Sequence, residues 1–513
     1  YEISSFSNRA GTYEDYFMVA PGEDVVFPLN DSECAPSYLC IGSGTSFSSP
    51  LVAGAAALVL ERLPQLTAKE IAEILFASAT DLGEPGPDAI YGQGMLNVFV
   101  ALQPIGVTTL AVQNWAVFSV ETSGLLLGDA FGDAPQLRAA LRAVPIRDSF
   151  TRDFGIDLSN LVLNAPRTNL AGIMEQQSRW HGAAFRLGMT SGVAVQLFDK
   201  QKIPFQVLNG LEEADRYRGV VRFNGRSGAV AWSAGSGLAL STALGRDSAE
   251  DNVAPLTRAF GNMLENRVGH FATARIALNE RTDLSFGMSQ ASTPNYGPNY
   301  GDHILPGLNK KTLSRLAGLR LDYAAPDAVL SFEMGNAWEE GAVLGSTGSG
   351  ALDIGARSAS IWTKFGGAVR LDTHWALKAS TSLALTKAGQ DRGNLVVSFA
   401  PILSTAASLG LTRSNLINSG DVLSFTLHQP LRVERAQMVL LTAATNPENG
   451  AAALQSREVS LAPSGREIAF EIGYGGNFGA WRTQFNIAYR RDAGHVADEG
   501  GTAAMLWLSR GFW

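Results

Sequence analysis

Apolar and polar residues alternate with a period of two over most of the chain, from about residue 181 to residue 513. Successive side chains of a β-strand point to opposite faces, so this period predicts strands. Gly, Asn, Asp or Pro separates the alternating segments, which indicates an antiparallel sheet with many turns. The clearest segments are 185–189, 284–288, 330–334, 467–474 and 481–490.

Period two does not say which face of the sheet meets water. An apolar-inward soluble sandwich and an apolar-outward membrane barrel give the same alternation. Three details favour the barrel: the large number of strands, full charges beside small residues on the polar face, and an aromatic final strand at 504–513. A closed barrel also removes exposed sheet edges. Against it, Arg510 shares a face with Leu506, Leu508 and Phe512. We predict the barrel over 181–513, and a soluble β domain stays open.

The first 102 residues carry a mixed α/β pattern. The apolar run Leu51–Leu60 predicts a buried helix, with Pro50 in its first turn. A second helix should begin at the capping box Thr67–Glu70 and place Ile71, Ile74 and Leu75 in the core. Residues 103–180 predict a linker or small connecting module, with short strands and a helix at Pro135–Ala143.

Composition and charge restrict the function classes. The net charge of -8, without basic clusters, argues against nucleic acid as a partner. The 54 glycines and 17% charged residues suit a β-rich chain with many turns. The chain contains no apolar run long enough to predict a membrane-spanning helix. It starts at Tyr1, within an already patterned segment, and is expected to be a fragment.

The two cysteines, Cys34 and Cys40, are close together in a loop-like stretch. A local disulfide in an oxidising compartment and two free thiols are both compatible with this spacing, and we favour the disulfide. A metal site at this pair is not expected, because no histidine or further cysteine is nearby.

Ser46 is the candidate nucleophile. The segment Gly44–Pro50 runs directly into the predicted helix, which places Ser46 at the helix N-terminus. Backbone N–H groups and the positive end of the helix dipole can stabilise an oxyanion there. Gly44 would allow close approach of a substrate, and the Thr45 hydroxyl could support the oxyanion or be structural. Taken alone, a serine at this position is more often a helix cap.

The order of motifs over residues 1–102 resembles the C-terminal part of the subtilase catalytic domain. Ser5–Asn8 is similar to the strand before the nucleophile, Val19–Gly22 to a family turn, and Gly44–Pro50 to the nucleophile motif. Val52–Gly54 continues that motif, and Tyr91–Asn97 resembles the closing segment. Leu51 stands where many subtilases carry a histidine that packs without catalysing. The resemblance implies a serine endopeptidase that forms an acyl-enzyme on Ser46, with Gly44, Thr45 and Ser46 lining the oxyanion and substrate site.

The resemblance also implies an Asp, a His and an oxyanion Asn that precede the nucleophile. This chain does not hold them, since its first histidine is His181 and both Asn8 and Asn30 are too close to Ser46. The chain alone is therefore expected to be inactive. No cofactor is expected, and any calcium site of the subtilase kind would lie upstream.

The predicted fold class is a partial α/β subtilase domain (1–102), a connecting module (103–180) and a large antiparallel β domain (181–513). This combination resembles the autotransporter serine proteases of Gram-negative bacteria. It implies a monomer at the outer membrane or cell surface that acts on polypeptides, contacts membrane lipid and does not bind nucleic acid. A pore-threading helix at Ala171–Trp180 is a candidate, although a surface helix is favoured. Two alternatives are a channel-forming outer-membrane protein with a remnant protease, and a protease with a soluble β-rich binding module.

Overall fold

The computed structural model consists of two compact units that we describe separately. Unit 1 contains residues 1–111, 145–156 and 443–455, and unit 2 contains the remainder. The described residues are 2–29, 39–111, 117–164, 184–189, 193–198, 221–238, 240, 244, 269–293, 312–355, 357–389, 394–445 and 452–510.

The described residues of unit 1 include a pair of short strands and three α-helices. Strands β1 (Val25–Pro28) and β2 (Leu39–Gly42) pair antiparallel. Helix α1 (Thr45–Arg62) is followed by α2 (Ala68–Ala77) and α3 (Val98–Ala101). The segment Ser5–Asn8, expected to be a strand, forms a turn and irregular backbone instead.

The helix α2 forms as its start signal predicts. The backbone N–H of Thr67 donates to Glu70 Oε2 at 2.7 Å, and Glu70 N–H returns a bond to Thr67 Oγ1 at 3.3 Å. These bonds satisfy donors that the helix leaves free. The bond from the Thr67 N–H, together with one from the Thr67 hydroxyl, lowers the pKa of Glu70. Ile71, Ile74 and Leu75 lie in the core as predicted.

The helix α1 differs from its prediction in two ways. It begins at Thr45, so Pro50 lies in its second turn. It is also largely uncovered: only Ala55 and Val59 are buried, because the described elements pack along one side of the helix.

A buried ion pair lies within residues 145–156, and its arginine also binds the end of α3. The side chains of Arg152 and Asp148 are both 0% exposed, and their closest approach is 2.6 Å. Arg152 also donates to the carbonyl oxygens of Ala101 and Gln103 at 2.6 and 2.8 Å. Near this pair, Thr109 of β3 (Thr109–Ala111) faces Arg147 of β6 (Val144–Arg147), and β7 (Asp153–Ile156) follows.

A small module in unit 2 precedes the large sheet. It contains β4 (Val117–Ser119), β5 (Gly124–Leu127), α4 (Pro135–Ala140) and β8 (Val162–Asn164). Helix α4 is shorter than predicted, since residues 141–143 form a turn. Strand β5 is buried along its whole length and pairs with both β8 and β17 (Thr347–Ser349). In the sequence, β17 belongs to a connection between two strands of the large sheet.

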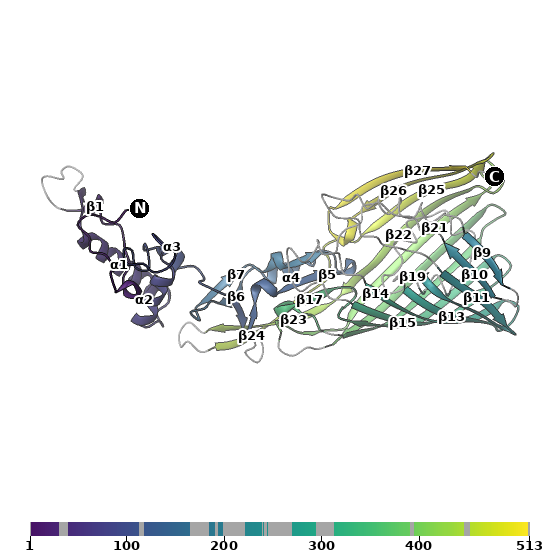
Figure 1. The fold of residues 1–513 in the computed structure, drawn as a ribbon. Helices are drawn as coiled ribbons and strands as arrows, with labels where there is room; N and C mark the ends of the chain where they lie inside the picture. Colours follow the sequence, from purple (N-terminus) through teal and green to yellow (C-terminus); the bar gives the residue numbers. More distant parts are fainter. Residues whose placement is uncertain are drawn as a thin grey trace. The chain divides into compact units, whose positions relative to one another are not determined.

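The large sheet follows, and its strands lie side by side from teal β9 to yellow β27 (Figure 1). It has 15 strands among the described residues, and β27 and β9 are the ends of the ladder. Adjacent strands of this sheet pair antiparallel. The strands are β9 (Ala184–Met189), β10 (Val193–Phe198), β11 (Val221–Ser227), β12 (Val230–Leu238), β13 (Gly269–Ala277), β14 (Thr282–Thr293), β15 (Thr312–Ala324), β16 (Ala328–Glu340), β18 (Arg357–Arg370), β19 (Trp375–Ala388), β21 (Ile402–Ser414), β22 (Val422–Arg435), β25 (Ile468–Phe478), β26 (Trp481–Arg491) and β27 (Gly500–Arg510).

The predicted architecture is confirmed: an α/β segment precedes a large antiparallel sheet. The five alternating segments listed above all lie on strands, except for residue 467 at the start of the fourth. The candidate helix at 171–180 lies outside the described residues, as do the side chains of Arg510 and Phe512.

The large sheet buries its polar face and exposes its apolar one. On β14, Asp283 and Ser285 are 7% and 1% exposed, whereas Phe286 and Met288 are 48% and 51% exposed. Strand β16 repeats this, with Glu333 buried and Met334 exposed. A soluble sandwich would show the opposite arrangement. We call the polar face the inner face and the apolar face the outer face.

The connections between strands are short at one end of the sheet and long at the other. Short turns cover 228–229, 278–281, 325–327, 371–374 and 479–480, with 415–421 slightly longer. The connections at the opposite end include 341–356, 389–401 and 436–467, and they carry the three-stranded sheet of β20 (Val396–Phe399), β23 (Gln437–Thr445) and β24 (Ala452–Ser460). Because β27 runs toward the short turns, the last described strand ends there. Among the described residues, no helix is both long and apolar enough to cross a bilayer.

Candidate active site around Ser46

Ser46 is the second residue of α1, in the first turn of the helix, whose N-cap is Gly44. Its side chain and that of Thr45 are solvent-exposed. A Cβ placed on Gly44 would meet no heavy atom closer than 3.9 Å, so the space over the start of the helix is open. The three residues proposed from the sequence therefore lie together where free backbone N–H groups and the helix dipole favour an anion.

The turn Val19–Gly22 is hydrogen-bonded to the segment Gly44–Ser48, which contains Ser46. Gly44 N–H donates to the Gly22 carbonyl at 2.7 Å, and Ser48 Oγ donates to the carbonyls of Ala20 and Pro21 at 3.0 and 3.2 Å. A Cβ at Gly22 would lie 2.6 Å from Ser48 Oγ, so glycine is required for this close approach. Ser48 is a supporting residue that the sequence did not single out, although it lies within the motif.

An aromatic pair also packs beside the segment that contains Ser46. The rings of Phe27 on β1 and Phe47 on α1 have their centroids 4.9 Å apart. A Cβ at Gly42 would approach Phe47 Cζ to 2.8 Å and Phe27 Cε1 to 2.9 Å. Gly42 thus allows the rings to pack over the backbone that leads to Ser46. The sequence offered no period or motif that paired these two rings.

The closing segment Tyr91–Asn97 runs beside the same turn. Leu96 N–H donates to the Val19 carbonyl at 2.8 Å. Gly92 has φ 59°, and a Cβ there would lie 2.2 Å from the Phe17 carbonyl oxygen, so only glycine fits. A backbone hydrogen bond from Tyr91 lowers the pKa of Asp88, whose carboxylate holds this turn.

In the described part of unit 1, no histidine lies beside the candidate nucleophile Ser46. Of the six histidines, none precedes residue 181. His270, His374, His428 and His495 lie in the large sheet or its connections, in unit 2, and His181 and His303 lie outside the described residues. Asn8 lies in irregular backbone, and Asn30 is not described.

The structure describes only one of the two cysteines in the predicted disulfide. Cys40 on β2 is disulfide-bonded, and no described cysteine is free. Cys34 lies outside the described residues, so its pairing with Cys40 stays a prediction. No group of three or more potential metal ligands occurs in the part of the chain that the structure describes.

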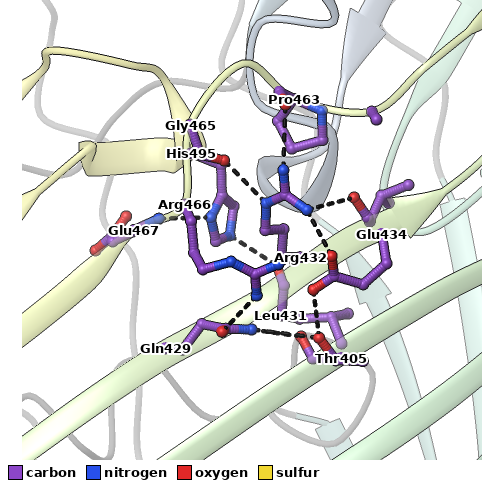
Figure 2. Close-up of polar contacts among 12 residues, drawn as sticks. Thr405, Gln429, Leu431, Arg432, Glu434, Pro463, Gly465, Arg466, Glu467 and His495 are labelled. Carbon is purple, nitrogen blue, oxygen red and sulfur yellow. Dashed lines mark hydrogen bonds and ion pairs between the residues drawn. The ribbon is translucent and has the colours of Figure 1, made fainter.

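A second polar cluster lies where β22 meets the connections before β25 and β27 (Figure 2). Arg432 donates to Glu434 Oε2 at 2.6 Å and to the carbonyls of Gly465 and Pro463. Arg466 donates to the same Glu434 oxygen and to Gln429 Oε1, both at 2.7 Å. Both guanidinium groups are satisfied by this chain, which indicates a structural junction.

His495 is the buried centre of this junction. Its Nδ1 accepts the Glu467 N–H at 3.0 Å, and its Nε2 lies 2.9 Å from the Leu431 carbonyl. An acceptor at Nδ1 and a carbonyl opposite Nε2 together require the neutral ring protonated at Nε2. Burial is the main cause that lowers the pKa of His495 to about 4.

Comparisons with known proteins find sequence relatives of the N-terminal segment. The family model described as "Subtilase family" matches residues 1–94. Serotype-specific antigen 1 of Mannheimia haemolytica is 39% identical over 99 residues, which cover 19% of this chain and 11% of that protein. Subtilisin DY of Bacillus licheniformis is 38% identical over 102 residues, 20% of this chain and 32% of that protein. The Neisserial autotransporter lipoprotein NalP of Neisseria meningitidis serogroup B is 38% identical over 60 residues, 12% of this chain and 6% of that protein.

Solved structures similar to this chain include the outer-membrane protein OmpT of Vibrio cholerae. Its TM-score is 0.34 at 10% identity, over 63% of this chain and 87% of OmpT. OprB of Pseudomonas putida gives a TM-score of 0.33 at 11% identity, over 62% of this chain and 81% of OprB. The family model and these relatives agree on the first segment: residues 1–94 of this chain match the subtilase family.

Proposed function

We propose that this chain carries the nucleophile of a subtilisin-like serine endopeptidase and anchors it at the outer membrane of a Gram-negative bacterium. The observation that supports the catalytic role is the exposed position of Ser46 at the N-terminus of α1. Attack by Ser46 Oγ on a peptide carbonyl would form an acyl-enzyme, with the first-turn N–H groups, Gly44 and Thr45 around the developing oxyanion.

The general base, the orienting carboxylate and the oxyanion amide would come from polypeptide outside these 513 residues. The uncovered face of α1 supports this, because Leu51, Leu58 and Leu60 are 40%, 49% and 43% exposed. An apolar helix of this kind is stable when further polypeptide covers it. The matched segment is also a small share of each relative, 11% of the Mannheimia antigen and 32% of subtilisin DY.

The 513-residue chain alone should react slowly with a fluorophosphonate probe, because unit 1, which holds Ser46, contains no histidine to take its proton. Labelling followed by gel fluorescence and mass spectrometry measures this, with Ser46→Ala as the matched control. Rapid labelling that Ser46→Ala abolishes would show that the base lies within this chain. Co-expression with an upstream subtilase segment should restore labelling, and failure to do so would contradict the assigned nucleophile.

The membrane anchor is carried by the outer face of the large sheet. Its apolar side chains are exposed along neighbouring strands while serines and carboxylates are buried behind them. So large an exposed apolar surface is unfavourable for a monomer in water, whereas the hydrocarbon of a bilayer stabilises it. The contrast of short turns with long connections is also typical of outer-membrane barrels. The autotransporter relative suggests export as a surface-anchored monomer.

The purified chain should be recovered in detergent and should migrate faster on gels unheated than after boiling, as folded outer-membrane barrels do. Recovery from detergent-free buffer as a monodisperse soluble protein would instead support the soluble β-module alternative. Gel migration with and without boiling, together with partitioning between membrane and buffer, distinguishes the two.

A further inference from the structure

Three cationic side chains lie on the large sheet at the end that carries the long connections. Arg357 begins β18, Lys387 lies near the end of β19, and Arg435 ends β22. All three side chains are exposed. We call these three residues the basic rim. Strands β18, β19, β21 and β22 are consecutive neighbours in the ladder, so the basic rim follows one edge of a continuous surface (Figure 1).

Two members of the basic rim lie directly beyond the apolar band of the outer face. On β19, Lys387 follows Leu383 and Leu385 at the two-residue spacing of one strand face, and these leucines are 49% and 43% exposed. On β18, Arg357 precedes Ile361 at an even spacing, and Ile361 is 58% exposed. The charged groups and the apolar side chains therefore share the outer face.

Arg435 reaches the same face through strand pairing. It is opposite Leu403 on β21, and Leu403 is opposite Leu385 on β19. Directly opposed residues of an antiparallel pair lie on the same face of a sheet. The basic rim therefore lies wholly on the outer face, at its boundary with the long connections.

A tryptophan marks the same boundary. Trp338 on β16 is opposite Ala359 on β18, and Ala359 is opposite Lys387. The Trp338 side chain is 47% exposed. Exposed tryptophans of membrane proteins gather where hydrocarbon meets the lipid headgroups. The basic rim would therefore lie at headgroup level when a bilayer covers the apolar band.

The carboxylates near the basic rim are paired with other arginines. Glu340 binds Arg315 at 3.0 Å, and Glu434 binds Arg432 and Arg466 at 2.6 and 2.7 Å. Within the described residues, no member of the basic rim forms an ion pair. Its three positive charges are therefore available to an anion from outside the chain.

The short-turn end of the sheet has a different charge pattern. Its turns and strand ends carry Glu280, Arg281, Asp327, Arg370 and Asp372. One of these arginines, Arg370, lies 3.6 Å from Asp327. Carboxylates there offset the neighbouring arginines, which makes this end a poorer match for an anionic surface.

We propose that the basic rim binds the phosphate groups of lipid A, the phosphorylated glycolipid of the outer leaflet of a Gram-negative outer membrane. The proposal rests on the membrane-spanning role proposed above. Long connections form the external side of an outer-membrane barrel, so the basic rim would face the outer leaflet. Arginine and lysine bind phosphate through charge-assisted hydrogen bonds, and their apolar stems can lie along the acyl chains.

The test measures lipid binding to the folded full chain by native mass spectrometry from detergent, with diphosphoryl lipid A and phosphatidylethanolamine as the probes. The wild type should bind lipid A in preference to phosphatidylethanolamine. The Arg357→Gln/Lys387→Gln/Arg435→Gln variant should bind lipid A on the order of a hundredfold more weakly, because each cation near an anionic lipid surface contributes to binding. The Arg357→Lys/Lys387→Arg/Arg435→Lys variant keeps the three charges and should retain most of the affinity.

The matched control removes three positive charges from the short-turn end, with the Arg226→Gln/Arg281→Gln/Arg370→Gln variant, and should bind lipid A as the wild type does. An equal loss in this control would overturn the proposal, and so would an unchanged affinity in the folded glutamine variant of the basic rim. Inorganic phosphate at matched ionic strength should displace little lipid A. Complete displacement would assign the basic rim to free phosphate instead of a membrane lipid.

Heat-modifiable gel migration, measured on every preparation, separates the two levels of the proposal. A wild type without a heat-modifiable form would contradict the membrane role, and the lipid site would fail with it. A heat-modifiable wild type that binds lipid A no better than phosphatidylethanolamine would overturn the lipid site alone and leave the membrane role intact.

Discussion

Replacing Arg152 with methionine is expected to lower the free energy of unfolding of unit 1 by about 3–5 kcal/mol, the usual cost of leaving a buried partner charge unpaired. Asp148 accepts two bonds from the Arg152 guanidinium, at 2.8 and 2.6 Å, and its side chain is 0% exposed. The substitution would remove the cation that balances this buried carboxylate, which would keep only its bonds from the backbone N–H groups of Ile105, Phe150 and residue 152. It would also leave the carbonyls of Ala101 and Gln103 without their donor.

The helical circular-dichroism signal during urea unfolding measures this loss, since α1, α2 and α3 all lie in unit 1. The matched control is Arg147→Met, seven-tenths buried in its pair with Asp153 at 2.7 Å, for which we expect roughly 1 kcal/mol or less. Equal urea midpoints for the two variants would contradict the role given to Arg152. Combining Arg152→Met with Asp148→Asn should recover part of the loss, because the stranded charge is gone.

Acidification is expected to loosen the junction around His495. Burial lowers its pKa in the folded protein to about 4 from the usual 6.5. Between these values the unfolded segment binds more protons than the folded one, so stability is complete above pH 6.5 and is lost as the pH falls toward 4. The full difference corresponds to about 3 kcal/mol, from the standard conversion of a pKa shift to free energy.

Protonation would also place an N–H at Nδ1 against the Glu467 N–H, beside the cationic Arg432 and Arg466. Glu434 and Glu467 are the anionic groups of the junction, and they only partly offset this cost. Hydrogen exchange of residues 461–467 and 493–499, corrected for the intrinsic rate, should show protection falling on the order of a hundredfold from pH 7 to pH 4.

The His495→Gln variant is the control, because its amide can accept and donate in the same places but does not titrate in this range. Its protection should be nearly independent of pH. A wild type and variant that lose protection in parallel would assign the acid response to the carboxylates instead.

The local chemistry of unit 1 was readable from the sequence. The capping box at Thr67 and Glu70 and the core positions of α2 follow from short-range hydrogen bonds and a helical period, and both are confirmed. The start of α1 differs from the prediction: Pro50 predicts a first helical turn, whereas the helix begins at Thr45. The Phe27–Phe47 pair and the Ser48 bonds were not found, since they join residues far apart in the chain.

The resemblance to subtilases, the position of Ser46 at a helix start and the large antiparallel sheet could all be predicted from the sequence. Each of these follows from a contiguous motif or from a period that strand geometry imposes. Only the tertiary structure decided which face of the sheet is outward, because alternation is the same for both orientations. It also decided which charges lie together on the outer face: Arg357, Lys387 and Arg435 are far apart in the sequence, and only strand pairing brings them to one end of the sheet.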